Sequence, residues 1–160
     1  PLITAIIVSG RSGAAITAEL GTMAVSEEID ALRTMALSPG RFLLLPRLLA
    51  LLCAVPCLTI LSNIAGIFGG YWIGVIVLGL GSRNYLQQTE QTLLIGDIVT
   101  GMVKSFVFAL LIGLVSCYRG VYVRGGAEGV GTNTTASVVT SIVLCILADA
   151  VFTTIFFYLD

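Results

Sequence analysis

Long apolar runs alternate with short polar stretches along this chain, and the lengths of the runs predict membrane helices. Apolar residues dominate residues 1–18, 42–80, 97–118 and 136–158. A helix needs about 20 apolar residues to cross a bilayer core of roughly 30 Å. The last three runs meet that length, and the first is typical of the second half of a span whose first half is missing. We therefore expect an all-α, polytopic membrane protein with about four transmembrane helices, the first of them truncated.

The third run is longer than one crossing requires. Residues 47–78 alone would extend about 48 Å as a helix, so this helix must tilt, protrude or break, and Pro56 could kink it. Gly66, Gly70 and Gly74 recur at every fourth position of the run. Such a ridge of small residues lets another helix approach closely, and we predict that these three glycines are helix-packing positions.

A compact charged island separates the first run from the third. Within it, residues 26–37 are predicted to form a short amphipathic helix, because Ser26 is a good N-cap and acidic residues follow in the first turn. Ser38, Pro39 and Gly40 then end the helix. The positions that form its apolar stripe are Val25, Ile29, Leu32 and Ala36. The charged residues off that stripe are Glu27, Glu28, Asp30 and Arg33.

The basic residues near the ends of the runs predict an orientation. Membrane loops rich in Lys and Arg face the cytoplasm, so the island and a glycine-rich loop over residues 119–135 are expected there, with Gly125–Gly131 as a flexible turn. The polar link at 81–96 carries only Arg83 and is expected outside, together with Asp160. The six basic residues of the cytoplasmic side are Arg11, Arg33, Arg41, Arg47, Arg119 and Arg124.

Lys104 and Asp149 lie inside apolar runs, where ionisable groups are costly and mark pairing or function. The rise per residue places both at nearly the same depth, so we predict an ion pair between the fourth and fifth segments. The pair either locks helix packing or forms a polar contact for a headgroup or a gate. Glu19, at the cytoplasmic end of the first helix, is a third candidate, either as a surface residue or as a partner of Arg11.

Composition narrows the function classes. The chain is 57% hydrophobic and 11% charged, with a net charge of −1 and no histidine, whereas soluble domains carry about 25% charged residues. No basic field points to nucleic acid, and the commonest general base and metal ligand is absent, so no catalytic residue and no metal site are expected. The four cysteines lie in or beside apolar runs and are interpreted as packing residues. The chain has no G-x-x-x-x-G-K-[ST] motif for nucleotide phosphates.

The charged island resembles that of the MlaE (YrbE) family of permeases, and the resemblance extends over nearly the whole chain. Glu28 stands where the family often has Gln, and Ser38 where it often has Asp. The matching positions of the island are Arg11, Gly13, Ala18–Gly21, Met23, Glu27–Leu32 and Pro39. Those downstream are Pro46, Arg47, Pro56, Gly69, Gly70, Lys104, Ser105, Val107, Phe108, Gly129–Gly131, Thr134, Thr135, Val138 and Asp149.

This resemblance implies one permease domain over residues 1–160, truncated at its N-terminus, and a bacterial inner-membrane location. It implies a homodimer that moves phospholipid between the inner membrane and an MCE-domain protein. A separate cytoplasmic ABC ATPase would bind ATP and Mg²⁺, and this chain would hold no cofactor. The 26–37 helix would be the coupling helix that docks on that ATPase through Glu27, Glu28, Asp30 and Arg33.

Two other functions remain open from the sequence. One is a secondary transporter or channel that uses Lys104 and Asp149 as an ion relay, although the chain shows no inverted repeat. The other is a membrane scaffold that anchors an MCE protein without transporting anything. The first predicts activity without an ATPase, and the second predicts that changes in the 26–37 helix leave lipid traffic intact.

Overall fold

The computed structural model describes residues 1–77, 79, 81–92 and 95–159, and every regular element in these ranges is a helix. The predicted all-α class is confirmed. Asp160, together with positions 78, 80, 93 and 94 of the predicted segments, lies outside the described residues. In chain order the elements are α1 (Leu2–Val8), η1 (Ser9–Gly13), α2 (Ala14–Val25), α3 (Glu28–Thr34), η2 (Gly40–Leu44), α4 (Leu45–Ile76), α5 (Ser82–Thr92), α6 (Ile95–Val121) and α7 (Gly126–Leu159).

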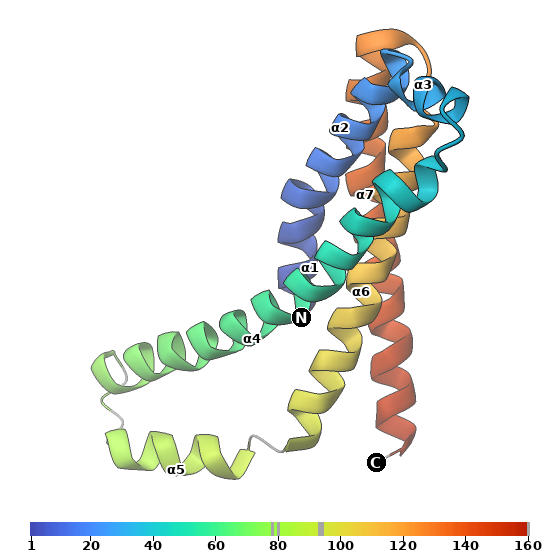
Figure 1. Ribbon diagram of the computed structural model, residues 1–160. Coiled ribbons are helices and arrows are strands. Elements are labelled where there is room, and N and C mark those ends of the chain that lie inside the picture. The colour runs from blue at the N-terminus through green and yellow to red at the C-terminus, as the bar shows by residue number, and fades with distance from the viewer. Residues whose placement is uncertain (78, 80, 93–94, 160) are drawn as a thin grey trace.

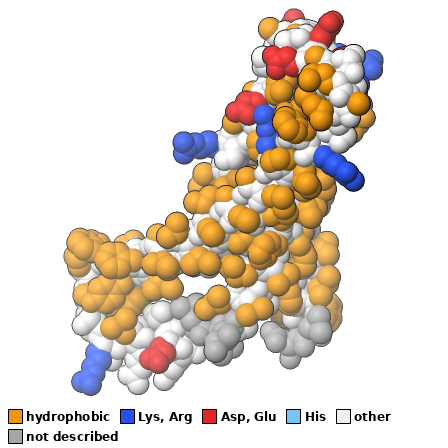
Figure 2. Space-filling view, viewed as in Figure 1, with side chains coloured by type: hydrophobic (Ala, Val, Ile, Leu, Met, Phe, Trp, Pro, Cys, Tyr) orange, Lys and Arg blue, Asp and Glu red, His pale blue; other side chains and the backbone are white. Residues whose placement is uncertain are grey.

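Within the described part of the chain, three helices are long and apolar enough to cross a membrane: Gly40–Ile76, Gly96–Val121 and Gly126–Tyr158. They correspond to the last three predicted runs. Figure 2 shows apolar side chains covering the length of the visible face, whereas charged side chains gather mainly at the end that carries α3. The chain is a multi-pass membrane protein.

The first apolar run forms one continuous helix that includes a π-helical turn. α1, η1 and α2 follow one another without a break, and the helix ends at Val25 rather than near Ala18 as the sequence predicted. The π-turn begins at Ser9, whose Oγ donates a hydrogen bond to the Val138 carbonyl of α7 at 3.4 Å. Single π-turns inside helices are rare and frequently mark functional sites.

α4 remains one unbroken helix despite its excess length. It continues through Pro56 without interruption, and Figure 1 shows it crossing α6 obliquely, so that the two helices diverge toward α5. Leu51, Val55 and Thr59 are buried against the bundle. In contrast, every residue from position 60 to 69 is exposed. One half of α4 therefore belongs to the core, and the other half extends away from it.

The core lies where α1, α4, α6 and α7 meet, and small residues bring other helices close to α6. A Cβ added to Gly113 of α6 would lie 2.6 Å from Leu48 Cδ1 of α4. A Cβ added to Gly120 would lie 2.6 Å from Leu20 Cβ and 3.1 Å from the Thr17 carbonyl oxygen of α2. The buried apolar cluster consists of Ala5, Val8, Leu51, Val55, Phe108, Ala109, Ile112 and Cys145.

Both predicted polar connections differ from the structure. The loop expected at 119–135 is wrong, because α6 continues to Val121 and α7 begins at Gly126. Gly125 and Gly126 have φ of +94° and +68°, so glycine makes the turn in a few residues and the rest of the expected flexible segment is helical. The link at 81–96 contains α5, a helix that the sequence reading did not assign.

Candidate functional site

α3 is shorter than the predicted 26–37 helix, and Ser26 does not cap it. Because α2 continues to Val25, Ser26 is the C-cap of α2, and its Oγ donates to the Thr22 carbonyl at 2.8 Å and to Glu28 Oε1 at 3.3 Å. Glu27 then turns the chain with a left-handed backbone (φ +60°, ψ +13°), and α3 begins at Glu28. The N-terminal boundary and the cap predicted from the sequence are therefore wrong.

The other end of α3 is a Schellman turn with alanine at its left-handed position. Leu37 N–H donates to the Leu32 carbonyl and Ala36 N–H to the Arg33 carbonyl, both at 3.1 Å. This pair of bonds defines the Schellman motif, which usually has glycine where Ala36 lies here with φ +59°. α3 is thus held between two tight turns.

α3 presents a charged surface to solvent. Ile29 is buried and anchors the helix, whereas Val25 and Ala36 of the predicted apolar stripe are exposed. Arg33 Nη1 donates to Asp30 Oδ1 at 3.0 Å, and both side chains are exposed. The predicted coupling residues Glu27, Glu28, Asp30 and Arg33 are all exposed, so this face is open to a partner.

Glu19 lies at the same end of the molecule and pairs with α4. Its Oε2 lies 3.1 Å from Arg47 Nη2 in a salt bridge, with 63% of the Glu19 side chain and 23% of the Arg47 side chain exposed. The prediction that Glu19 is a surface residue is therefore confirmed. Within the described residues its ion-pair partner is Arg47 rather than Arg11. Arg47 belongs to the first turn of α4.

The predicted ion pair between the fourth and fifth segments is confirmed. Lys104 Nζ lies 3.0 Å from Asp149 Oδ1, and the two side chains are 16% and 27% exposed. Lys104 Nζ also donates to Thr153 Oγ1 at 2.9 Å. The sequence reading missed Thr153, although its position one turn beyond Asp149 was a usable signal. Whether this cluster is a gate stays a prediction.

A groove of about 730 Å³ opens beside Lys104, between α6 and the diverging half of α4. Gly66 lines this groove, and a Cβ added there would meet nothing within 4 Å. Gly70 is a close-packing position, because an added Cβ would lie 2.6 Å from the Tyr85 hydroxyl of α5, and Gly74 is buried. Among the described residues, the predicted glycine ridge is therefore packed at Gly70 and buried at Gly74, whereas a side chain at Gly66 would have open space around its Cβ.

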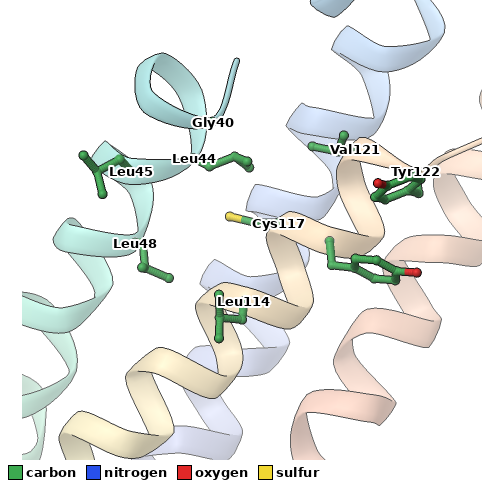
Figure 3. Close-up of a pocket in the computed structure, with 9 residues that line it drawn as sticks. Gly40, Leu44, Leu45, Leu48, Leu114, Cys117, Val121 and Tyr122 are labelled. Carbon is green, nitrogen blue, oxygen red and sulfur yellow. The ribbon is translucent and has the colours of Figure 1, made fainter. Parts of the chain in front are cut away.

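The groove combines polar and apolar lining. The polar residues are Ser62, Asn63, Tyr85, Asp97, Thr100 and Lys104, and the apolar ones include Ile60, Ile64, Ile67, Ile98 and Met102. A second groove of about 400 Å³ lies near the α3 end and is almost entirely apolar. Figure 3 shows Leu44 and Leu48 on one side of it and Leu114 and Cys117 on the other.

Buried hydroxyls join α2, α6 and α7, which the sequence reading did not anticipate. Thr17 Oγ1 lies 2.9 Å from Ser137 Oγ, 3.2 Å from the Ser116 carbonyl and 3.0 Å from the Gly13 carbonyl. Thr17 and both serines are fully buried. The spacing of small residues at positions 9, 13, 17 and 21 was the signal, since such positions let membrane helices approach closely.

These helices and charges define a multi-pass helical membrane protein that carries the short, charged and exposed helix α3 beyond its spans. The Permease MlaE family matches residues 1–155. The chain therefore belongs to the MlaE permease family, which confirms the resemblance seen in the sequence. Because the family is one of permeases, the expectation that this chain is not an enzyme is confirmed as well.

Curated relatives are bacterial and chloroplastic. A probable ABC transporter permease protein of Rickettsia typhi is 40% identical over 98% of this chain and 61% of its own length. The Arabidopsis thaliana protein TRIGALACTOSYLDIACYLGLYCEROL 1, chloroplastic, is 41% identical over 98% of this chain and 45% of its own. A probable ABC transporter permease protein of a Synechocystis strain is 35% identical over 93% and 57%. The chain spans about three fifths or less of the length of these relatives.

Proposed function

We propose that this chain is part of the permease subunit of an ATP-driven phospholipid transporter. α3 carries the proposal: it is a short helix with an exposed charged face, beyond the spans and at the end where basic residues gather. That is the place and form of a contact for a cytoplasmic ATPase. The relatives named as probable ABC transporter permeases support this assignment.

Phospholipid is the proposed cargo. A phospholipid has a polar head and apolar tails, and the groove beside Lys104 has both kinds of lining. The name of the Arabidopsis relative contains that of a glycerolipid. The transporter would work as a homodimer in a bacterial inner membrane, with an MCE-domain protein on the face opposite α3.

Mass spectrometry of the full-length protein, gently extracted with its native partners, tests the proposal. We expect a co-purifying ATPase, an MCE protein and stoichiometric phospholipid. Recovery of the protein without an ATPase and without lipid would contradict the proposal and favour the ion relay or the scaffold.

Substitutions in α3 test the coupling contact. We expect Glu28→Ala combined with Arg33→Ala to release the ATPase and stop lipid transfer in proteoliposomes, because both residues lie on the exposed face. Arg124→Gln is the matched control, since Arg124 is an exposed arginine outside α3. Unchanged docking and transport in the double variant would remove the coupling role of α3.

The ion relay remains the alternative, because Lys104 and Asp149 form an intramembrane pair. It predicts ion flux through the purified permease in liposomes without an ATPase. It also predicts that Lys104→Met with Asp149→Leu abolishes that flux. If the pair only locks packing, the double variant keeps ATP-driven lipid transport, because a matched pair can be replaced by apolar residues at little cost.

A further inference from the structure

The Glu19–Arg47 ion pair closes the base of the segment that carries α3. Glu19 lies in α2, Arg47 lies in the first turn of α4, and α3 lies between them in the chain. α2 and α4 both pack against α6. The 3.1 Å contact between Arg47 Nη2 and Glu19 Oε2 joins the two helices directly.

The electrostatics of the pair favour its staying closed. The Arg47 side chain is mostly buried, and its Nη1 is buried with no hydrogen-bond partner among the described residues. A buried charge without a counter-charge is costly. Glu19 supplies that counter-charge. Because the Glu19 side chain is mostly exposed, its carboxylate loses little hydration free energy in forming the pair. Opening the pair would leave the buried guanidinium without its anion.

The backbones on both sides of the pair are fixed by close packing. Leu20, next to Glu19, lies against Gly120, and Leu48, next to Arg47, lies against Gly113. Both glycines belong to α6 and are about two helical turns apart. The pair therefore bridges two anchored backbones, whereas the segment above it turns through single residues in left-handed conformation at Glu27 and Ala36.

We propose that Glu19 and Arg47 are positioning residues for transport, which make the adjoining ends of α2 and α4 move as one body. A displacement of α3 by the ATPase reaches these two helices through the turns at Glu27 and Ala36, and the closed pair makes both helices respond together, whereas without the pair each helix responds separately. This inference rests on the proposed function and names the contact that couples the two helices.

The test uses the full-length protein with its ATPase in proteoliposomes, and the readout is lipid moved per ATP hydrolysed. We expect Glu19→Gln and Arg47→Gln to lower this ratio by about fivefold or more, the lower bound of typical coupling between sites, while the ATPase stays bound. Arg47→Lys keeps the contact and most of the ratio. The charge-exchanged variant, Glu19→Arg with Arg47→Glu, recovers the ratio relative to the single variants. Arg41→Gln, which removes a charge two residues into η2, leaves it unchanged.

Hydrogen exchange of the amides in residues 26–44 separates the two proposals, because it does not depend on the cargo. We expect faster exchange in the neutral variants and a return toward wild type in the charge-exchanged one. A wild-type complex that hydrolyses ATP without moving lipid would contradict the proposed function. In that case the hydrogen exchange of residues 26–44 would still decide whether the Glu19–Arg47 pair holds this segment. Wild-type exchange and coupling in both neutral variants, or no recovery on charge exchange, would overturn the inference.

Discussion

At the residue scale, Glu27 and Ala36 adopt a left-handed backbone conformation, which favours glycine. Glu27 and Ala36 have φ of +60° and +59°, and they bracket α3. A left-handed conformation costs an L-residue about 1–2 kcal/mol. At Ala36 the two Schellman hydrogen bonds offset this cost. The strain is thus located at both ends of the helix that we propose meets the ATPase.

Ala36→Gly is therefore expected to stabilise the protein by about 1 kcal/mol, because glycine adopts the left-handed conformation without steric cost. The thermal midpoint of the detergent-solubilised protein measures the change. Ala31→Gly is the matched control, since Ala31 lies in the middle of α3 with helical backbone. It should destabilise by up to about 1 kcal/mol. A lower midpoint for Ala36→Gly would contradict the argument from strain.

The buried Thr17 hydroxyl and its contacts with Ser116 and Ser137, here called the Thr17 node, are a second feature at the scale of single residues. Thr17→Val keeps the shape of the side chain and removes hydrogen bonds that join α2 to α6 and α7. Side-chain hydrogen bonds between membrane helices contribute about 0.6 kcal/mol on average and up to about 1.7. We expect a loss of about 1 kcal/mol in the unfolding free energy, measured by denaturation in mixed micelles.

Thr22→Val is the control for that substitution. Thr22 is exposed, and its Oγ1 donates to the Ala18 carbonyl in its own helix. Its replacement should change stability by less than about 0.5 kcal/mol. Equal effects at both positions would show that the node contributes nothing beyond local helix hydrogen bonding.

At the element scale, the long helices were predictable because length and apolar composition determine them. The Lys104–Asp149 pair was predictable because two charges at one depth have few other partners. The ends of α3 were not, since the choice of Ser26 as cap assumed that α2 had already ended. The close approach of α2 to α6 could not be predicted either, because it depends on which glycine lies against which neighbouring helix. The four-residue spacing of glycines indicated Gly66 as a packing position, whereas the structure packs tightly at Gly120.

Gly120→Ala is expected to destabilise the protein by about 1–3 kcal/mol, because an added Cβ would meet Leu20 Cβ and the Thr17 carbonyl and force α2 and α6 apart. Gly66→Ala should be neutral or stabilise α4 by about 0.5–1 kcal/mol in a monomer, since its added Cβ meets nothing within 4 Å. Thermal midpoints of the two variants in detergent measure the contrast.

Size-exclusion chromatography with light scattering extends that comparison to the oligomer. If Gly66→Ala dissociates a dimer while the fold persists, the glycine ridge packs between two copies of the chain. A Gly66→Ala variant that loses helicity as a monomer would contradict the open environment of this position.

At the scale of the whole molecule, the two ends differ in their number of basic residues. α3, η2 and the turn between α6 and α7 lie at one end in Figure 1, and α5 lies at the other. Arg33, Arg41 and Arg124 belong to the first end, and Arg83 belongs to α5. The positive-inside rule predicts that the α3 end faces the cytoplasm.

Single cysteines introduced at Asn84 and Arg124, in a variant without native cysteines, should therefore be labelled from opposite sides of the membrane. A membrane-impermeant maleimide applied to intact cells measures this, with permeabilised cells as the control. We expect labelling at Asn84 in intact cells, and at Arg124 only after permeabilisation. Labelling of both from one side would contradict the orientation.

The Thr17 node has a consequence for how the protein is made. Its partners lie 99 and 120 residues further along the chain, and at a synthesis rate of about 5–20 residues per second the last of them emerges roughly 10 s later. Throughout that delay, the Thr17 hydroxyl can bond the Gly13 carbonyl of its own continuous helix, but its contacts with α6 and α7 are missing. Early insertion intermediates therefore leave the small-residue face around Thr17 uncovered by these two helices, and an insertase or membrane chaperone that covers this face would protect it until α6 and α7 arrive.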